Sequence, residues 1–420
     1  MRDDASAVLS RRAGELFATA GLRAFAALDF ITTRDLLNRA ALLLPPSDPQ
    51  RLEMLPNLGV ALTETGRPQE TEMLLTDALE RSLKAGLERE ALRAKVQLLS
   101  NCVYRSPSDA EVSAAVAESE AAFTAFEAAD DHVGCAEAAV ALEYLEFMRG
   151  RVFQAHEWCH RALQHGLAAG RFRESAQAAA DLVFMVTLGP VPFHRFPQIA
   201  TEQVFPLGDP IAACAGHCLM AVAALAAGKE AEFTEHERRW RETTDLHGLG
   251  WLGAAQALLV ADVETSAGHP KAAERRLREA RNVLVSLGDV WWVSTLDSTL
   301  CKAIGAQADT QRFLRLADEF DLSPPVTDRE ILIRRNLVRA QAFLLRGSPA
   351  DAEAAARAGI ELAAPTDLVT DHADALLTLA AALDARGLTA DAAKTQAEAE
   401  TMLRAKGHMA AIATLSQRPT

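Results

Sequence analysis

The sequence predicts an all-α fold, an α-solenoid built from about ten stacked helix-turn-helix repeats. Alanine-rich runs such as "SAQAAADL" and "CLMAVAALAAG" favour closely packed helices, because alanine has a high helix propensity and a small side chain. Long alternating runs of Val, Ile and Thr, which are typical of strands, do not occur in the sequence. Helix-breaking points recur along the chain at nearly constant spacing. We therefore expect no sheet and one continuous array over residues 1–420.

The recurring break is clearest in "SAGHPKAAERRLREA", where Pro270 follows two residues after Gly268. Glycine ends a helix in the left-handed conformation, and proline suits the first turn of the next helix. The segments "GRP" and "GSP" repeat this pattern, so we interpret His269 as a turn residue rather than a ligand. The ten breaks are 37 to 45 residues apart and lie at Asp29, Gly66, Arg105, Gly150, Gly189, Gly228, Gly268, Gly305, Gly347 and Gly387.

Small residues at fixed distances from the breaks predict that the helices of each pair cross closely. Such a pair cannot bury its apolar face alone, so neighbouring pairs must stack. Seven residues before the break the small residues are Gly59, Ala221, Ala261, Ala340 and Ala380. Twelve residues after it they are Ala41, Ala78, Ala117, Ala162, Ala280, Ala317, Gly359 and Ala399, with Thr201 and Trp240 as exceptions.

The most irregular stretch is "TLGPVPFHRFP" at 187–197, which contains three prolines. Proline cannot continue a helix, so we expect the array to bend here. The bend would divide residues 10–186 from residues 198–415.

The stretch "LPNLGVALTETGRPQETEMLLTDALE" resembles a tetratricopeptide repeat, with Gly59 in the first helix, Gly66 at the turn and Ala78 in the second helix. Segments including "GDVWWVSTLDSTLCKAIG" and "LIRRNLVRAQAFLLRGSPADAEAAARAGIELAAPTDL" extend the likeness over nearly the whole chain. Their order resembles the tetratricopeptide-rich C-terminal region of large bacterial signalling proteins of actinobacterial type. There the region follows class III adenylate or guanylate cyclase, transcription-activator or signalling ATPase modules. The resemblance implies a regulatory scaffold or sensor.

Composition argues against several classes of protein. The formal net charge of −14 opposes direct binding of nucleic acid, which needs a basic surface. A signal peptide and a stretch of about 18 apolar residues are both missing from the sequence, so we expect no membrane segment. The six cysteines lack the paired spacing of zinc or redox motifs and predict reduced thiols in the cytoplasm. No P-loop motif occurs, and we expect no cofactor.

Two short motifs have the residue types of metal sites. "HEWCH" places His156, Glu157 and His160 in the pattern of a zinc hydrolase, but the third ligand would have to come from His165 or Glu174 at unsuitable spacing. We interpret it as a partly exposed helix face. "CAGHC", which contains two thiols one turn apart, lies in an apolar run and predicts buried small side chains. We therefore expect neither a metal site nor a catalytic site.

The remaining candidate site is the concave groove, which the first helix of each tetratricopeptide pair lines. Cationic and amide side chains there suit an extended peptide or a carboxylate, and aromatic side chains supply anchors. For Trp292, packing in the core is the competing interpretation. By the repeat register the residues expected to line the groove are Arg23, Asn57, Lys95, Tyr144, Trp292, Arg334 and Gln341.

We therefore expect a non-enzymatic tetratricopeptide scaffold or sensor that binds a protein or peptide partner in bacterial signal transduction or transcription regulation. One alternative is the C-terminal regulatory part of an ATP-binding regulator or cyclase whose catalytic modules lie outside this chain. A more distant alternative is the zinc hydrolase centred on "HEWCH".

Overall fold

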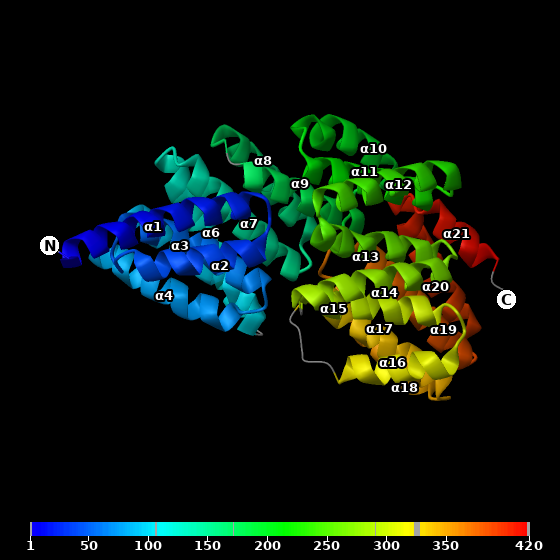
Figure 1. The fold of residues 1–420 in the computed structure, drawn as a ribbon. Helices are drawn as coiled ribbons and strands as arrows, with labels where there is room; N and C mark the ends of the chain where they lie inside the picture. Colours follow the sequence, from blue (N-terminus) through cyan, green and yellow to red (C-terminus); the bar gives the residue numbers. More distant parts are fainter. Residues whose placement is uncertain (1, 106, 171, 290, 323–327, 418–420) are drawn as a thin grey trace. The chain divides into compact units, whose positions relative to one another are not determined.

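The polypeptide consists of helices joined by short turns and loops in the part that the computed structural model describes, which is residues 2–105, 107–170, 172–289, 291–322 and 328–417 (Figure 1). No strand occurs in these ranges, so the prediction of an all-α fold is confirmed. The chain divides into two compact units. Unit 1 comprises Met1–Leu145 and Glu157–Ala178, and unit 2 comprises Glu146–His156 and Ala179–Thr420. The division passes through 146–178, so the bend expected at 187–197 stays a prediction.

Unit 1 is built from helices that pack in sequence order around fully buried leucines such as Leu37, Leu55 and Leu58. Its elements are α1 (Arg2–Ala26), α2 (Phe30–Leu43), α3 (Pro49–Glu64), α4 (Pro68–Lys84), α5 (Glu88–Asn101), η1 (Cys102–Arg105), α6 (Asp109–Ala128), and parts of α7 (His132–Met148), α8 (Val152–Ala168) and α9 (Phe172–Leu188).

Unit 2 contains the remaining parts of α7, α8 and α9, followed by short turns and five further helix pairs. The first helices α11, α13, α15, α17 and α19 contact one another in series and form one layer, which we call the first-helix layer. Its elements are η2 (Phe193–Arg195), α10 (Phe196–Ile199), η3 (Ala200–Val204), η4 (Phe205–Leu207), α11 (Pro210–Ala226), α12 (Glu230–His247), α13 (Gly250–Ser266), α14 (Pro270–Leu287), α15 (Trp291–Gly305), α16 (Thr310–Asp321), α17 (Arg329–Leu345), α18 (Pro349–Ala363), α19 (Val369–Ala385), α20 (Thr389–Lys406) and α21 (Met409–Ser416).

The predicted turn is present where the Gly-x-Pro segments occur. Gly268 has a φ of 91°, and Pro270 begins α14 with His269 as the preceding N-cap residue. His269 makes no side-chain capping hydrogen bond, in agreement with its interpretation as a turn residue. The break assigned to Gly305 is different, because Gly305 ends α15 and the left-handed residue is Ala308 (φ 59°). The amide of Gln341 packs against Gly305 so closely that a Cβ there would lie 2.5 Å from Nε2.

The small residues predicted at the helix crossings are nearly all buried. Ala221, Ala261 and Ala340 have no exposed surface, and a Cβ at Gly59 would lie 2.9 Å from a methyl group of Leu75. The prediction is wrong at Ala117, which is exposed because the neighbouring Ala115 and Val116 face the core instead.

Polar contacts between successive first helices join residues about one repeat apart. In unit 1 the buried Arg93 of α5 forms a bidentate ion pair with Glu137 of α7, at 2.6 and 2.5 Å. These residues are 44 positions apart, and other pairs in unit 2 are 37 and 40 positions apart. Such spacing is expected when each helix pair stacks on the next. The α-solenoid prediction is therefore confirmed.

In unit 2 the last helices also return to the first part of the unit. The Lys406 ammonium donates to the carbonyl oxygens of Val186, Gly189 and Val191 at 2.7, 2.5 and 2.7 Å. It also lies 4.7 Å from the centre of the Phe193 ring. Helix α21 contacts α11 and α13. The repeat pattern did not predict these contacts, and those of Lys406 span more than 200 residues of sequence.

We expect Lys406→Met to lower the free energy of unfolding of unit 2 by about 2 kcal/mol or more, because three buried carbonyl groups would lose their donor. Urea titration followed by tryptophan fluorescence measures this, since Trp240, Trp251 and Trp292 lie in unit 2. The control is Lys394→Met, an exposed residue on the same helix. Equal midpoints for the two variants would show that the Lys406 contacts do not stabilise the unit.

Candidate partner-binding site

The predicted groove residues of unit 1 differ in exposure. Arg23 of α1 is exposed, whereas Asn57 of α3 is buried. Lys95 of α5 is half-exposed, and its ammonium lies 2.7 Å from the Glu118 carboxylate. The hydroxyl of Tyr144 on α7 donates to that of Tyr104, the residue one repeat earlier, at 3.1 Å.

The predicted groove residues of unit 2 are Trp292 on α15 and Arg334 and Gln341 on α17. Trp292 and Gln341 are half-buried, and Arg334 is buried. The structure thus places these three on adjacent members of the first-helix layer, while the other four belong to unit 1. Binding of a partner by any of the seven stays a prediction.

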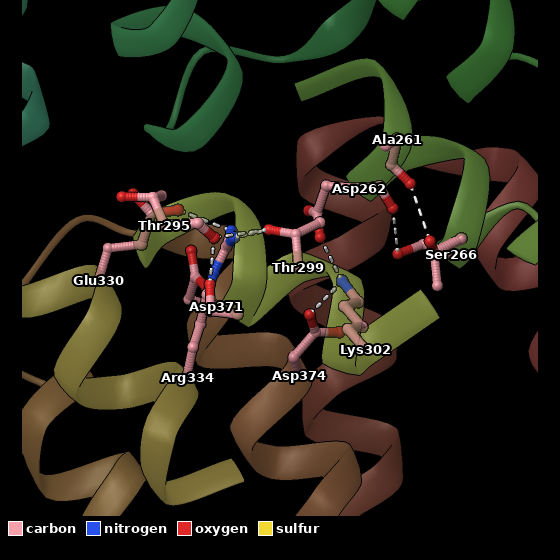
Figure 2. Close-up of polar contacts among 12 residues, drawn as sticks. Ala261, Asp262, Ser266, Thr295, Thr299, Lys302, Glu330, Arg334, Asp371 and Asp374 are labelled. Carbon is pink, nitrogen blue, oxygen red and sulfur yellow. Dashed lines mark hydrogen bonds and ion pairs between the residues drawn. The ribbon is translucent and has the colours of Figure 1, made fainter. Parts of the chain in front are cut away.

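Arg334 is at the centre of a group of charged residues that connects four helices of the first-helix layer (Figure 2). Its guanidinium donates to the Asp371 carboxylate and to the Thr299 hydroxyl, each at 2.6 Å, and lies 2.8 Å from a carboxylate oxygen of Glu330. We call the whole set the charged cluster. It consists of Asp262 on α13, Lys302 on α15, Asp328, Glu330 and Arg334 at and within α17, and Asp371 and Asp374 on α19.

Lys302 is the second cation of the charged cluster and lies between Asp262 and Asp374 (Figure 2). Its ammonium is 2.9 Å from the Asp262 carboxylate and 2.5 Å from that of Asp374. Burial lowers the pKa of Lys302, but the two carboxylates outweigh this effect and the net pKa is raised. About a quarter of the side-chain surface remains exposed on Lys302 and Asp374 (26% and 24%), so this end of the cluster is open to solvent.

The charged cluster contains five carboxyl groups and two cations, and it does not hold all five negative charges easily. Burial raises the pKa of Asp328 to about 7, and Asp371 adds to this shift while Arg334 opposes it. Burial likewise raises the pKa of Glu330 well above its usual value and raises the pKa of Asp374. Because burial disfavours the charged form of an acid, these raised pKa values favour protonation of carboxyl groups in the cluster.

Several buried polar atoms around the cluster have no hydrogen-bond partner among the residues that the structure describes. They are Oδ2 of Asp328, Oδ2 of Asp371, Oγ1 of Thr295 and Nε2 of His408. Each of these residues is at least nine-tenths buried. A buried polar group without a partner costs about 1–3 kcal/mol, and in native proteins such groups are uncommon.

Aromatic side chains adjoin the cluster along α15. The ring of Trp292 lies 4.8 Å from that of Phe184 and 6.3 Å from that of Trp251, between ring centroids. The Trp251 indole donates to Asp289 at 2.8 Å. Because Trp292, Thr295, Thr299 and Lys302 recur every three or four residues, they lie on one face of the helix. The aromatic residues and the charged cluster therefore line the same face of α15.

Sequence reasoning proposed Trp292 and Arg334 as groove residues but did not single out Lys302 or its carboxylate partners. A usable signal was present, since Asp262 and Lys302 each interrupt a strongly apolar first helix, in "LLVADV" and "LCKAIG". A charge within an apolar helix is rarely buried unless it has a partner. Two such charges one repeat apart, with opposite sign, predict a pair between neighbouring first helices.

The motifs "HEWCH" and "CAGHC", which have the residue types of metal sites, lie on α8 and α11. Glu157 is exposed on α8, while His156 and His160 are half-buried. Cys214 and Cys218 are fully buried on α11, as expected for small side chains in an apolar run. Within the described ranges, no group of three or more His, Cys, Asp or Glu side chains is arranged to hold a metal ion. No helix in those ranges has the length and apolar character needed to cross a membrane.

A comparison with the solved structure of a Rap protein supports the fold. The Rap protein complexed with competence and sporulation factor is 14% identical to this chain, with a TM-score of 0.50, and the match covers 94% of this chain and 99% of that one. Scc4 in complex with Scc2n is 12% identical, with a TM-score of 0.47, over 96% of this chain and 76% of that one. No family model and no curated protein matches the sequence. The chain has a tetratricopeptide-type α-solenoid fold.

We expect Asp328→Asn to stabilise the protein at pH 8 by about 1 kcal/mol or more, with the difference vanishing near pH 4. A raised pKa in the folded state means that Asp328 contributes most stability below its unfolded value of 3.8 and loses it as the pH rises through about 7. Asparagine does not titrate and caps a helix as well as aspartate does. Denaturant titration from pH 4 to pH 8 measures the difference.

The control for this measurement is Asp309→Asn, because Asp309 caps α16 in the same way but is exposed. If the stability change of Asp328→Asn were the same at every pH, the raised pKa would be contradicted.

Proposed function

We propose that this chain is a non-enzymatic partner-binding scaffold or sensor that acts in signal transduction or transcription regulation. In this proposal an extended segment of a protein or peptide binds along the face of the first-helix layer that contains Trp292, Arg334 and the charged cluster. The observation that supports it is the placement of charged and unpaired polar groups within the buried part of this layer.

Stacking alone does not require these charges. Replacing a buried ion pair with well-packed apolar residues is often neutral or stabilising, so the charged cluster is an expensive way to hold helices together. Unpaired acceptors such as Oδ2 of Asp371 add to that cost. A ligand that supplies the missing hydrogen bonds would recover it. The cost in the free protein therefore supports a binding role.

The nearby aromatic group suits the same role. Trp292 is half-buried and is flanked by Phe184 and Trp251, so its ring presents an apolar surface with a fixed orientation. Tryptophan in such a setting often contributes a large share of binding energy. Apolar anchors beside polar pairing groups are the combination that extended peptide segments need.

Two residues of unit 1, Arg23 and Lys95, have exposed surface and remain candidates for contacting a partner. Asn57 is buried, Tyr144 is bonded to Tyr104, and Gln341 packs against Gly305. We propose smaller roles in binding for these three. A cytoplasmic location is also part of the proposal, supported by six cysteines that are all buried and form no disulfide bond with one another.

We expect peptides selected from a random displayed library on the intact chain to lose at least tenfold in affinity for Trp292→Ala, or about 1.4 kcal/mol. The control is Phe153→Ala, because Phe153 is an aromatic residue of the same unit and 48% of its surface is exposed. Fluorescence anisotropy with the selected peptides measures both variants. The proposed function fails if the library yields no binders, or if both variants bind with unchanged affinity.

A further inference from the structure

We infer that the charged cluster binds a cationic side chain, a lysine or arginine of the partner segment, beside its own Lys302 and Arg334. This inference rests on the proposed function, because it names the chemistry of the partner at the same site. The partner would be a basic segment of a protein, with its cation placed among the carboxylates of α13, α17 and α19.

The charge balance of the cluster is the first argument. Arg334 is shared by Asp371 and Glu330, and Lys302 is shared by Asp262 and Asp374. Each cation thus has two carboxyl groups. Asp328 adds a fifth carboxyl group, and Arg334, which already has two, is the cation that attracts it. A third cation would reduce the excess, whereas an anionic segment would increase it.

The unpaired atoms are a second and independent argument. Among the described residues, Oδ2 of Asp328 and Oδ2 of Asp371 are buried acceptors without donors. An ammonium offers three N–H donors and a guanidinium offers five, so either cation can serve acceptors on both α17 and α19. Charge-assisted hydrogen bonds of this kind are about twice as strong as neutral ones.

His408 adds a buried polar atom without a partner, which fits a ligand that has a peptide backbone in addition to a cation. Its Nδ1 atom accepts from the main-chain N–H of Ala411 at 3.3 Å and caps α21. Burial lowers the pKa of His408 to about 4, so the neutral ring has its proton on Nε2. That N–H has no acceptor among the described residues. The charge of Lys302 lowers the pKa of the ring and the charge of Asp262 raises it, so the ring interacts electrostatically with the charged cluster. A peptide carbonyl of the partner would supply the acceptor.

Asp374 is the most exposed carboxyl group of the charged cluster, so we expect a cation to enter beside it. Asp374 keeps about a quarter of its side-chain surface exposed, while Asp328 and Asp371 are almost fully buried. Besides burial, the charges of Asp262 and Asp371 raise the pKa of Asp374. Asp374 therefore interacts electrostatically with the partner of Lys302 and with the partner of Arg334. A long, flexible lysine or arginine side chain can extend from solvent past Asp374 toward the buried carboxyl groups.

The experiment measures binding of fluorescein-labelled oligolysine to the intact chain by anisotropy, with oligoglutamate and an uncharged Gly-Ser peptide of equal length as comparisons. The net charge of −14 attracts any polycation, so the decisive result comes from variants that remove one negative charge each. We expect Asp374→Asn and Asp328→Asn each to weaken oligolysine binding at least fivefold. The control is Asp309→Asn, which removes an exposed charge and should change binding less than twofold.

A second measurement tests the cluster without relying on loss of binding. A cation that enters must displace protons from the acids with raised pKa values, so calorimetry in two buffers of different ionisation enthalpy should detect proton release at pH 7. We expect Asp328→Asn to reduce that release. The charged and titratable groups that act directly on Asp328 are Glu330, Arg334 and Asp371. The remaining groups of the set act on these or on one another, and they are Asp262, Lys302, Asp374 and His408.

The outcomes separate this inference from the proposed function. Equal affinities for Asp374→Asn, Asp328→Asn and Asp309→Asn, with no proton release, would overturn the cationic site. If library peptides then still depended on Trp292, the binding function would stand without charge selection. Competition between oligolysine and those peptides supports both, and oligoglutamate binding as tightly as oligolysine contradicts the inference.

Discussion

The whole architecture depends on one geometric constraint: each first helix must stack on its neighbour at a fixed register, one repeat away. The turns set the length of the repeat, and small residues such as Gly59 and Ala261 allow the helices to approach. Because the register is fixed, side chains about 40 residues apart meet in space, as Asp262 and Lys302 do. Apolar residues and charges are therefore placed by the same rule, and the site is a product of the stacking itself.

The charged residues that meet between neighbouring first helices differ between the two units. In unit 1 the pair of Arg93 and Glu137 is buried and balanced, with one carboxylate for one guanidinium, and both oxygens are used. In unit 2 the corresponding layer holds more carboxyl groups than cations, and Oδ2 of Asp371 is among the atoms left without a partner in the described residues. A balanced pair suits a structural role, because it leaves nothing for a ligand to complete. An unbalanced cluster leaves both charge and hydrogen bonds for another molecule to supply.

Periodicity made the fold predictable, because Gly268 and Pro270 fix a turn by local chemistry and the turn recurs at nearly constant spacing. The site was only partly predictable. A single helix shows which residues share a face, and on that basis Trp292 and Arg334 were predicted to line the groove. It does not show which charges a neighbouring helix will cover, so Arg334 appeared as a free groove residue although Asp371 pairs with it. The contacts of Lys406 were beyond prediction, because nothing local relates it to residues more than 200 positions earlier.

The return of Lys406 to the carbonyl groups of Val186, Gly189 and Val191 has a consequence for biosynthesis. Domains fold as they emerge from the ribosome, N-terminal parts first, and helix pairs of a solenoid can form one after another. Unit 2 can therefore assemble most of its pairs during translation, but the three carbonyl groups stay without this donor until Lys406 has been made. Contacts of such long sequence separation slow folding, because the chain entropy is lost before the contact forms. A chain whose synthesis stops before this lysine would have its helices formed but would lack the contacts of Lys406 with the start of unit 2. Chaperones and proteases recognise incompletely packed intermediates of this kind.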